Sequence, residues 1–292
     1  MTKTYQLLYL LLCLGSFFIT FGCSSSNESK PIISVTIEPQ KYFLEQLADS
    51  FFVVQTMVPA GSSPENYDPS PLQMMKLEQS TAYFRIGHIA FEEVWMDKIA
   101  ENHPNLRIFD NSEGIALITS DEHHECTDHS HAGGVDPHIW SSPREAKLLA
   151  QNMCKELIDL DPDHKSIYEA NLVELEKKIV DTDSTISGLL RSGSQKSFII
   201  FHPALSYFAD YYGLKQFSIE IDGKEPSPDQ LARLIDTSRK EGIKTVFIQQ
   251  EFDQKNAEIM AKETKSKMYV IDLLSYDWHT EMINIAKALS EN

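Results

Sequence analysis

Five of the ten histidines in this chain of 292 residues fall between positions 123 and 138, where an even distribution would place fewer than one. The same segment holds carboxylates and one thiol, in the sequence DEHHECTDHSHAGGVDPHIW. Imidazole, carboxylate and thiolate groups are the ligands that a borderline-soft divalent metal such as zinc prefers. This composition therefore indicates that the protein handles a metal ion.

The histidine-rich segment divides into two parts. Its last histidine, His138, is followed by Ile139 and Trp140, an apolar continuation typical of a folded framework. The other four lie among Asp, Glu, Ser and Gly residues without apolar periodicity, which favours a loop. We expect these four to form an auxiliary metal-collecting loop, namely His123, His124, His129 and His131.

Short β-rich segments alternate with helical patterns along both halves of the chain. In the first half, strands are predicted over residues 32–37, 51–58, 81–86 and 106–109, with helices over 39–48, 71–79, 91–101 and 143–160. In the second half, strands are predicted over residues 197–201, 216–221, 245–249 and 268–271, with helices over 204–212, 228–240, 254–264 and 280–289. Such alternation indicates βαβ units and a parallel sheet in each half.

A long helical pattern separates the two halves. Between Asp163 and Arg191 the only Gly or Pro is Gly188, and apolar residues recur at spacings of three, four and seven. One continuous helix of this length would measure about 43 Å at 1.5 Å per residue. We therefore predict an α/β fold with two Rossmann-like lobes joined by a rigid spine helix. The alternative is a kinked helix pair within one domain.

Ligands of open α/β sheets bind beyond the carboxyl ends of the strands, so the residues at these positions test for function. Four candidate residues with an imidazole or a carboxylate follow predicted strands, and a fifth, His138, ends the histidine-rich segment. The resulting candidate metal ligands are Glu65, His88, His138, His202 and Asp272. Four N and O ligands complete a tetrahedral zinc site, and a fifth suits a looser coordination. We expect this site in the cleft between the lobes.

The N-terminus predicts export. Residues 1–22 carry Lys3 and an apolar core and end at Gly22, which is typical of a secretory signal. Cys23 and the polar residues after it resemble a bacterial lipoprotein cleavage site, with a plain signal peptide as the alternative. The predicted regions are a signal peptide (1–22), a lipidated tether (23–30), an N-terminal lobe (31–162, with the histidine loop at 121–134), a linking helix (163–192) and a C-terminal lobe (193–292).

Charge and cysteine content argue against a nucleic-acid-binding protein and against a disulfide-stabilised one. Without the leader the chain keeps 25 basic and 43 acidic residues, so its net charge is about −18, which disfavours nucleic acid as a partner. Cys13 leaves with the leader and Cys23 is predicted to carry the lipid, so only Cys126 and Cys154 remain, too few for a disulfide framework. The sequence leaves open whether these two cysteines pair.

Several motifs resemble the metal-binding solute-binding proteins of ABC transporters for zinc and manganese. The segment DPHIWSSP matches that family's Asp-Pro-His-x-Trp-x-Ser-Pro motif, and an acidic, histidine-rich loop precedes it as in zinc members. Further similar segments occur in the same order along the mature chain: GSSPENYDPSP, FHPALSYFADYYGL, KEPSPDQLARLI and VIDLL. The first of these differs from the family pattern, because Glu65 stands where the family has a histidine.

The resemblance implies that His138, His202 and Asp272 are metal ligands. Either Glu65 binds directly or His88 supplies the missing imidazole, and we favour His88 slightly. The family further implies a monomeric, lipid-anchored protein on a bacterial membrane that delivers Zn²⁺ to an ABC permease and its ATPase, with Mn²⁺ as the alternative cargo. A histidine at position 202 favours zinc over manganese. The family performs no catalysis.

Two other classes of function are disfavoured. A zinc hydrolase of the HExxH type needs two histidines four residues apart on a helix, whereas His124 is followed by His129 at a spacing of five. An adhesin would be expected to show an exposed aromatic stripe or a repeat, and the sequence has neither.

Overall fold

The N-terminal half forms a four-stranded parallel sheet in the order β2-β1-β3-β4 in a computed structural model that describes residues 30–119, 134–220 and 223–291. Parallel neighbours require crossover connections, which three helices provide. The strands are β1 (Ile32–Val35), β2 (Val53–Thr56), β3 (Ser80–Arg85) and β4 (Arg107–Asp110), and the helices are α2 (Glu38–Ala48), α3 (Pro71–Leu77) and α4 (Ala90–Asn102). Cys23, Cys126 and the four auxiliary histidines lie outside the described residues.

The C-terminal half repeats this topology. Its four parallel strands have the order β6-β5-β7-β8, so in both sheets the first and third strands lie at the centre. The strands are β5 (Ser197–Ile200), β6 (Lys215–Ser218), β7 (Thr245–Gln249) and β8 (Lys267–Ile271), and the helices are α7 (Ser206–Tyr212), α8 (Pro228–Glu241), α9 (Lys255–Thr264) and α10 (Trp278–Ser290). The predicted α/β architecture with two parallel sheets is confirmed.

The end of β1 shows why the predicted strand over 32–37 is too long. The side-chain oxygen of Gln40 accepts hydrogen bonds from the backbone N–H groups of Thr36 (2.9 Å) and Ile37 (3.2 Å). These bonds satisfy backbone donors at the start of α2, and the paired register of β1 with β2 ends at Val35. Position 37 is therefore a helix cap and not a strand residue.

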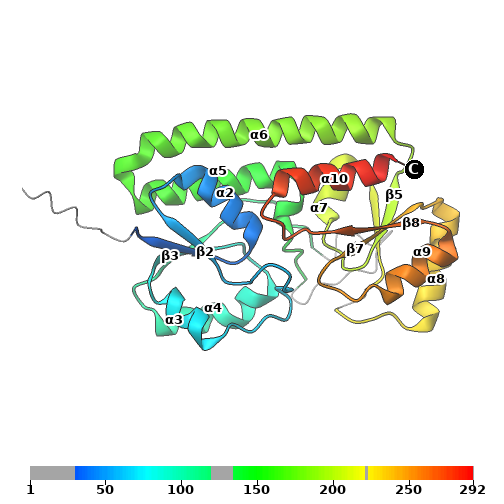
Figure 1. Ribbon diagram of the computed structural model, residues 1–292, viewed down its shortest axis with the longest axis horizontal. Helices are drawn as coiled ribbons and strands as arrows, with labels where there is room; N and C mark the ends of the chain where they lie inside the picture. The colour runs from blue at the N-terminus through cyan, green and yellow to red at the C-terminus, as the bar shows by residue number, and fades with distance from the viewer. Residues whose placement is uncertain (1–29, 120–133, 221–222, 292) are drawn as a thin grey trace, which may run out of the picture. The chain divides into compact units, whose positions relative to one another are not determined.

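A single helix, α6 (Lys165–Ser192), runs the length predicted for the spine. Its 28 residues span about 42 Å. The predicted apolar stripe is buried, including Leu175, Ile179 and Ile186, and it packs on α2, α5 (Pro143–Leu160) and α10. Figure 1 shows α6 alongside these helices, which belong to both halves of the chain. The predicted long helix is confirmed, without a break at Gly188.

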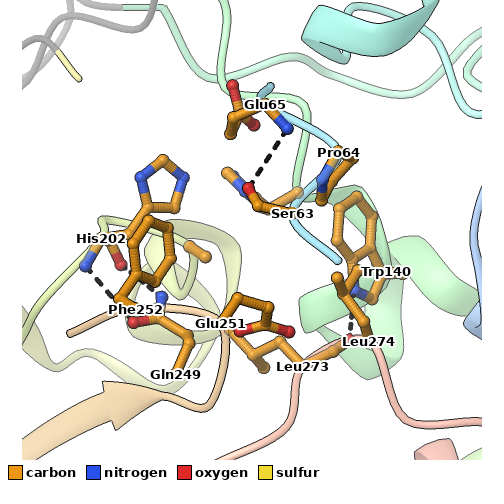
Figure 2. Close-up of a pocket in the computed structure, with 12 residues that line it drawn as sticks. Ser63, Pro64, Glu65, Trp140, His202, Gln249, Glu251, Phe252, Leu273 and Leu274 are labelled. Carbon is orange, nitrogen blue, oxygen red and sulfur yellow. Dashed lines mark hydrogen bonds between the residues drawn. The ribbon is translucent and has the colours of Figure 1, made fainter. Parts of the chain in front are cut away.

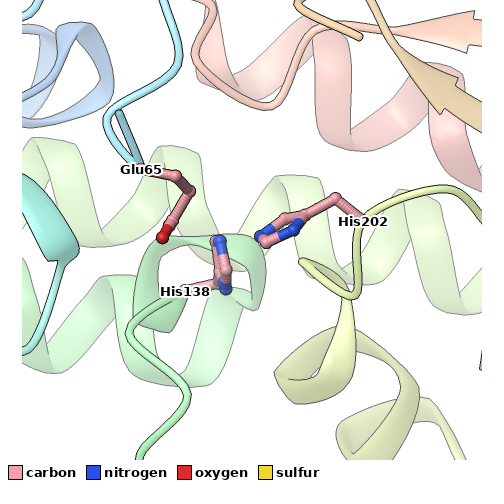
Figure 3. A group of neighbouring side chains, drawn as sticks. All are labelled: Glu65, His138 and His202. Carbon is pink, nitrogen blue, oxygen red and sulfur yellow. The ribbon is translucent and has the colours of Figure 1, made fainter. Parts of the chain in front are cut away.

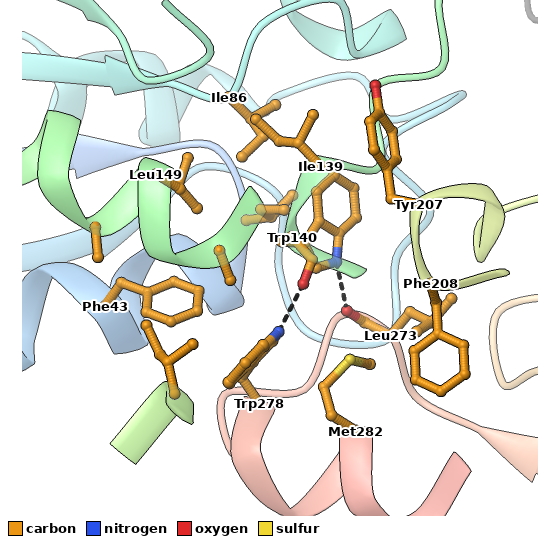
Figure 4. Close-up of a cluster of buried hydrophobic side chains, with 14 of the residues drawn as sticks. Phe43, Ile86, Ile139, Trp140, Leu149, Tyr207, Phe208, Leu273, Trp278 and Met282 are labelled. Atoms are coloured by element: carbon orange, nitrogen blue, oxygen red, sulfur yellow. Dashed lines mark hydrogen bonds between the residues drawn. The ribbon is translucent and has the colours of Figure 1, made fainter. Parts of the chain in front are cut away.

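One hydrophobic core extends through both halves. It includes Phe43 and Trp140 from the first half and Phe198, Phe247 and Trp278 from the second. Figure 4 shows Trp140 and Trp278 side by side within this cluster. Since the halves share a packed interior, they are joined by core packing as well as by the long helix.

No helix in the described part of the chain is long and apolar enough to cross a membrane.

Two tryptophans join the halves through hydrogen bonds as well as packing. The indole N–H of Trp140 donates to the carbonyl of Leu273 (2.8 Å), and that of Trp278 donates to the carbonyl of Trp140 (2.6 Å). Trp140 follows His138 by two positions, whereas Leu273 is next to Asp272. We call this arrangement the tryptophan clasp, and it ties together two segments that carry predicted metal ligands.

Candidate metal centre

Three potential metal ligands from distant parts of the chain meet in the structure. Glu65, His138 and His202 each offer one ligand atom, and these three atoms lie within 4.8 Å of one another. Figure 3 shows the carboxylate and the two imidazole rings converging. Glu65 lies in the loop after β2, and His202 lies two residues after the end of β5. His138 immediately precedes the short 3-10 helix η1 (Ile139–Ser141).

The ring of His138 is fixed by Asp136. The backbone N–H of His138 donates to Asp136 Oδ1 (2.9 Å), and His138 Nδ1 lies 2.8 Å from the same oxygen. Both residues are buried. Because the carboxylate accepts a hydrogen bond from the Nδ1–H group, it favours the tautomer whose Nε2 lone pair is available to a metal. The hydroxyl of Tyr207 donates to the Asp136 carbonyl (2.8 Å) and holds this segment further.

His202 is oriented in the same way by Glu220. Its Nδ1 lies 3.2 and 3.3 Å from the two carboxylate oxygens of Glu220. Burial alone lowers the pKa of His202, but the hydrogen bond to Glu220 and the charges of Glu220, Glu65 and Asp136 outweigh it, so that pKa lies above its ordinary value. The surrounding negative charge that stabilises a proton on this histidine also favours a divalent cation.

Residues at and after the end of β7 also contact His202. The side chain of Gln249 accepts from the His202 backbone N–H (3.3 Å) and donates to the His202 carbonyl (2.7 Å). Phe252 stacks on the imidazole with ring centroids 5.5 Å apart. No candidate residue was predicted in this segment, although ligands bind beyond the carboxyl ends of strands and β7 ends at Gln249.

Glu65 is more accessible to solvent than the two histidines. Its backbone N–H donates to Ser63 Oγ (3.3 Å), and the neighbouring Pro64 carbonyl accepts from the N–H of Phe91 (3.0 Å) at the start of α4. These bonds hold the loop after β2 against the first lobe. The carboxylate is thereby presented to the histidines, at the position where the family pattern has an imidazole.

The structure does not bring His88 into this group. His88 is half-buried and has a left-handed backbone, with φ of 59°. The preceding turn is held by Glu92, which accepts from the N–H groups of Ile86 (2.7 Å) and Gly87 (2.8 Å). A Cβ at Gly87 would lie 2.5 Å from Ser112 Oγ, so this turn requires glycine. Coordination by His88 stays a prediction.

Asp272 likewise lies outside the group of three ligands. Its Oδ1 accepts from the backbone N–H of Leu274 (3.1 Å), and its own N–H donates to Glu281 (2.8 Å). Burial raises the pKa of Asp272, against hydrogen bonds from Leu274 and Gln250 that lower it. These contacts organise the loop after β8. A metal-binding role for Asp272 also stays a prediction.

Stability should fall as the pH rises through the pKa of Glu92. Burial raises that pKa from 4.5 to about 7. The folded protein binds this proton more tightly than the unfolded chain does. The protonated Glu92 therefore stabilises the fold fully below pH 4.5, and this stabilisation is lost as the pH rises from 4.5 to about 7. The upper limit of this loss is on the order of 3 kcal/mol. Urea unfolding at several pH values should show a flatter profile for Glu92→Gln than for the wild type.

The exposed neighbour Glu93 provides the control for this measurement. Glu93→Gln should keep the wild-type pH profile. Glu156, whose pKa burial raises to about 8, contributes a loss in the same direction that persists in both variants. An unchanged slope in Glu92→Gln would contradict the role of Glu92.

Comparison with known proteins identifies the family. The model of the family described as "Zinc-uptake complex component A periplasmic", ZnuA, matches residues 33–291. The chain belongs to this family. A ZnuA relative from Bacillus subtilis (strain 168), described as a high-affinity zinc uptake system protein, is 28% identical over 268 residues, which cover 87% of this chain and 82% of the relative.

Solved structures of ZnuA have the same fold. One superposes with a TM-score of 0.83 at 33% identity and covers 90% of this chain and 98% of its own. A zinc-bound ZnuA deletion mutant gives a TM-score of 0.81 at 34% identity, covering 89% of this chain and 98% of its own. These matches extend over the whole two-sheet architecture, and ZnuA proteins are solute-binding components of transport systems.

Proposed function

We propose that this protein is the extracytoplasmic zinc-binding component of an ABC import system. In this role it captures Zn²⁺ at Glu65, His138 and His202 and delivers the ion to a membrane permease driven by a separate ATPase. The convergence of these three ligand atoms within 4.8 Å, from segments far apart in sequence, carries the proposal. The names of the relatives, which include zinc uptake proteins, support it.

The donor set suits zinc. Two imidazoles and a carboxylate are ligands of tetrahedral zinc sites, and zinc binds imidazole more strongly than the harder Mn²⁺ does. The carboxylates of Asp136 and Glu220, which orient the two rings, increase the basicity of both ligands. The site holds and releases an ion and catalyses no reaction on it.

The remaining predictions complete this proposal. The protein is a monomer, exported and anchored through a lipid on Cys23, and it keeps residues 31–162 and 193–292 as lobes on either side of the linking helix 163–192. The loop that contains His123, His124, His129 and His131 collects zinc at low affinity. Mn²⁺ is the alternative cargo, because Glu65 adds an oxygen ligand where the family has a nitrogen.

A competition titration tests the proposal. Purified protein stripped of metal should bind one equivalent of Zn²⁺ tightly against a strong chelator, and excess Mn²⁺ should not displace it. The chelator removes weak binding to the histidine-rich loop from the measurement. A protein that binds Mn²⁺ more tightly than Zn²⁺, or neither ion tightly, would contradict the proposed function.

Replacing Glu65 by histidine should increase the preference for zinc. The substitution restores a third imidazole, and we expect the ratio of zinc to manganese affinity to rise on the order of 10-fold. Glu65→Gln, which keeps the size of the side chain but removes its charge, should weaken binding of both ions. An equal ratio of zinc to manganese affinity in Glu65→His and the wild type would show that this side chain does not touch the metal.

A further inference from the structure

Tyr207 connects the second half of the chain to the segment that precedes His138. It lies on α7, five residues after His202, and its side chain is fully buried. Its hydroxyl donates to the carbonyl of Asp136 (2.8 Å) and accepts from the N–H of Ile118 (3.1 Å). One hydroxyl therefore joins the helix that follows one imidazole to the residues that precede the other.

The carbonyl that Tyr207 binds belongs to the residue that orients His138. Asp136 Oδ1 accepts from the His138 backbone N–H (2.9 Å) and lies 2.8 Å from His138 Nδ1. The Asp136 N–H donates to the Ile118 carbonyl (2.9 Å), so Ile118, Asp136 and Tyr207 form a closed ring of hydrogen bonds. Because an aspartate side chain is short, a shift of the Asp136 backbone would also move its carboxylate away from His138.

The Tyr207 hydroxyl keeps its proton in this position. Burial raises the pKa of Tyr207, and the negative charges of Asp136 and Glu145 raise it further. Figure 4 shows Tyr207 in the same buried cluster as Ile139 and Trp140. The hydroxyl is therefore a permanent donor within a packed interior, where a carbonyl that loses its partner costs free energy.

The second half of the chain holds the His138 segment on both sides. Asp136, two residues before His138, is bound by Tyr207. Trp140, two residues after His138, is bound through the tryptophan clasp. Figure 2 shows Trp140 and His202 on opposite sides of the cavity that His138 also lines. The place of His138 in this cavity thus depends on contacts with the half that carries His202.

The short stretch of chain between His202 and Tyr207 is well fixed. The His202 carbonyl accepts from the N–H of Ala204 (2.8 Å). The N–H of Leu205 donates to the side chain of Gln216 on β6 (2.9 Å). These bonds and the first turn of α7 hold the Tyr207 hydroxyl at a set distance from His202.

We propose that the Tyr207 hydroxyl is a positioning group that sets the place of His138 relative to His202 for zinc. It acts through Asp136 and is not a ligand. The inference rests on the proposed function. Distances between a metal and its ligands vary by only about 0.2 Å, so a displaced imidazole weakens binding. The cavity of about 30 Å³ leaves the ion little room to follow such a displacement.

Tyr207→Phe tests the proposal, because it removes the hydroxyl and keeps the ring. We expect zinc affinity in a chelator competition to fall on the order of 10-fold, as for other groups that orient metal ligands. In the metal-free protein, the His138 Nδ1–H proton should exchange with solvent on the order of 10-fold faster, because its bond to Asp136 opens more often. NMR on protein with isotope-labelled histidine measures this exchange.

Tyr212→Phe, on the same helix, is the matched control. The Tyr212 hydroxyl donates to Asp183 on α6 (2.7 Å), so this variant loses a comparable bond away from His138. It should keep the zinc affinity and the His138 exchange rate of the wild type.

Wild-type affinity in Tyr207→Phe, or equal losses in Tyr207→Phe and Tyr212→Phe, would overturn the proposal. A loss of affinity without faster exchange would also overturn it, since the hydroxyl would then not act through Asp136. Failure of the proposed function is distinguishable, because the wild-type protein itself would then not bind zinc tightly. The exchange measurement needs no metal and tests the role of Tyr207 in either case.

Discussion

Replacing either His138 or His202 by alanine should weaken zinc binding by about 100-fold or more. Loss of a group that only supports a ligand costs about 10- to 100-fold, and loss of the ligand itself should cost at least as much. Both rings are buried, 5.1 Å apart between centroids, and each is held through Nδ1 by a carboxylate. Water would replace the lost ligand poorly in so enclosed a position.

Chelator competition measures the loss of zinc affinity. The stability of the metal-free protein must be measured as well. Each substitution leaves a buried carboxylate, Asp136 or Glu220, without its imidazole, so some loss of stability is expected even without metal. His103→Ala, at the end of α4, is a suitable control and should retain wild-type affinity. Tight zinc binding by a folded His138→Ala, His202→Ala double variant would disprove the assignment of the site.

The sequence predicts the fold well because its local and global patterns agree. Apolar runs of strand length alternate with amphipathic helices, and Ser142 followed by Pro143 marks the start of α5 where the structure has it. The long helix is predictable from its apolar stripe, since Leu175, Ile179 and Ile186 recur at helical spacing and are the residues that the structure buries. These features depend on neighbours within a few turns of the chain.

The site is predictable only in part. The rule that ligands gather at strand ends selects residues that include Glu65 and His202, which the structure brings together with His138. It does not choose between Glu65 and His88, because the position of His88 depends on a left-handed backbone turn that Glu92 holds and that no sequence pattern marks. Nor does the sequence reveal that Asp272 Oδ1 accepts a hydrogen bond within its own loop, from the Leu274 N–H.

Contacts between the halves are the least predictable feature. The hydrogen bond from Trp278 to the Trp140 carbonyl joins residues 138 positions apart. No periodicity in the sequence marks such a pair, and each tryptophan alone suggests only a buried core residue. The tryptophan clasp therefore emerges from the structure, together with its proximity to the segment that carries His138.

Replacing Trp278 should have the largest effect on stability. Its side chain is buried and lies 5.2 Å from the ring of Phe43 between centroids. Trp278→Ala should lower the free energy of unfolding by about 3 to 5 kcal/mol, since it leaves a large cavity in the shared core. Trp278→Phe keeps most of the apolar contact but removes the donor to the Trp140 carbonyl, and it should cost about 1 to 3 kcal/mol. Urea unfolding of the metal-free protein measures both losses.

Trp95 provides a matched control, because its indole N–H has no hydrogen-bond partner within the described residues. Trp95→Phe removes an indole without removing such a bond, so it should cost less than Trp278→Phe. If the clasp also holds the metal site, Trp278→Phe should weaken zinc binding on the order of 10-fold, whereas Trp95→Phe should not. This coupling follows from geometry: the carbonyl that accepts from Trp278 belongs to Trp140, two residues after His138. Equal stability and equal zinc affinity in the two variants would show that the two halves are joined by packing alone.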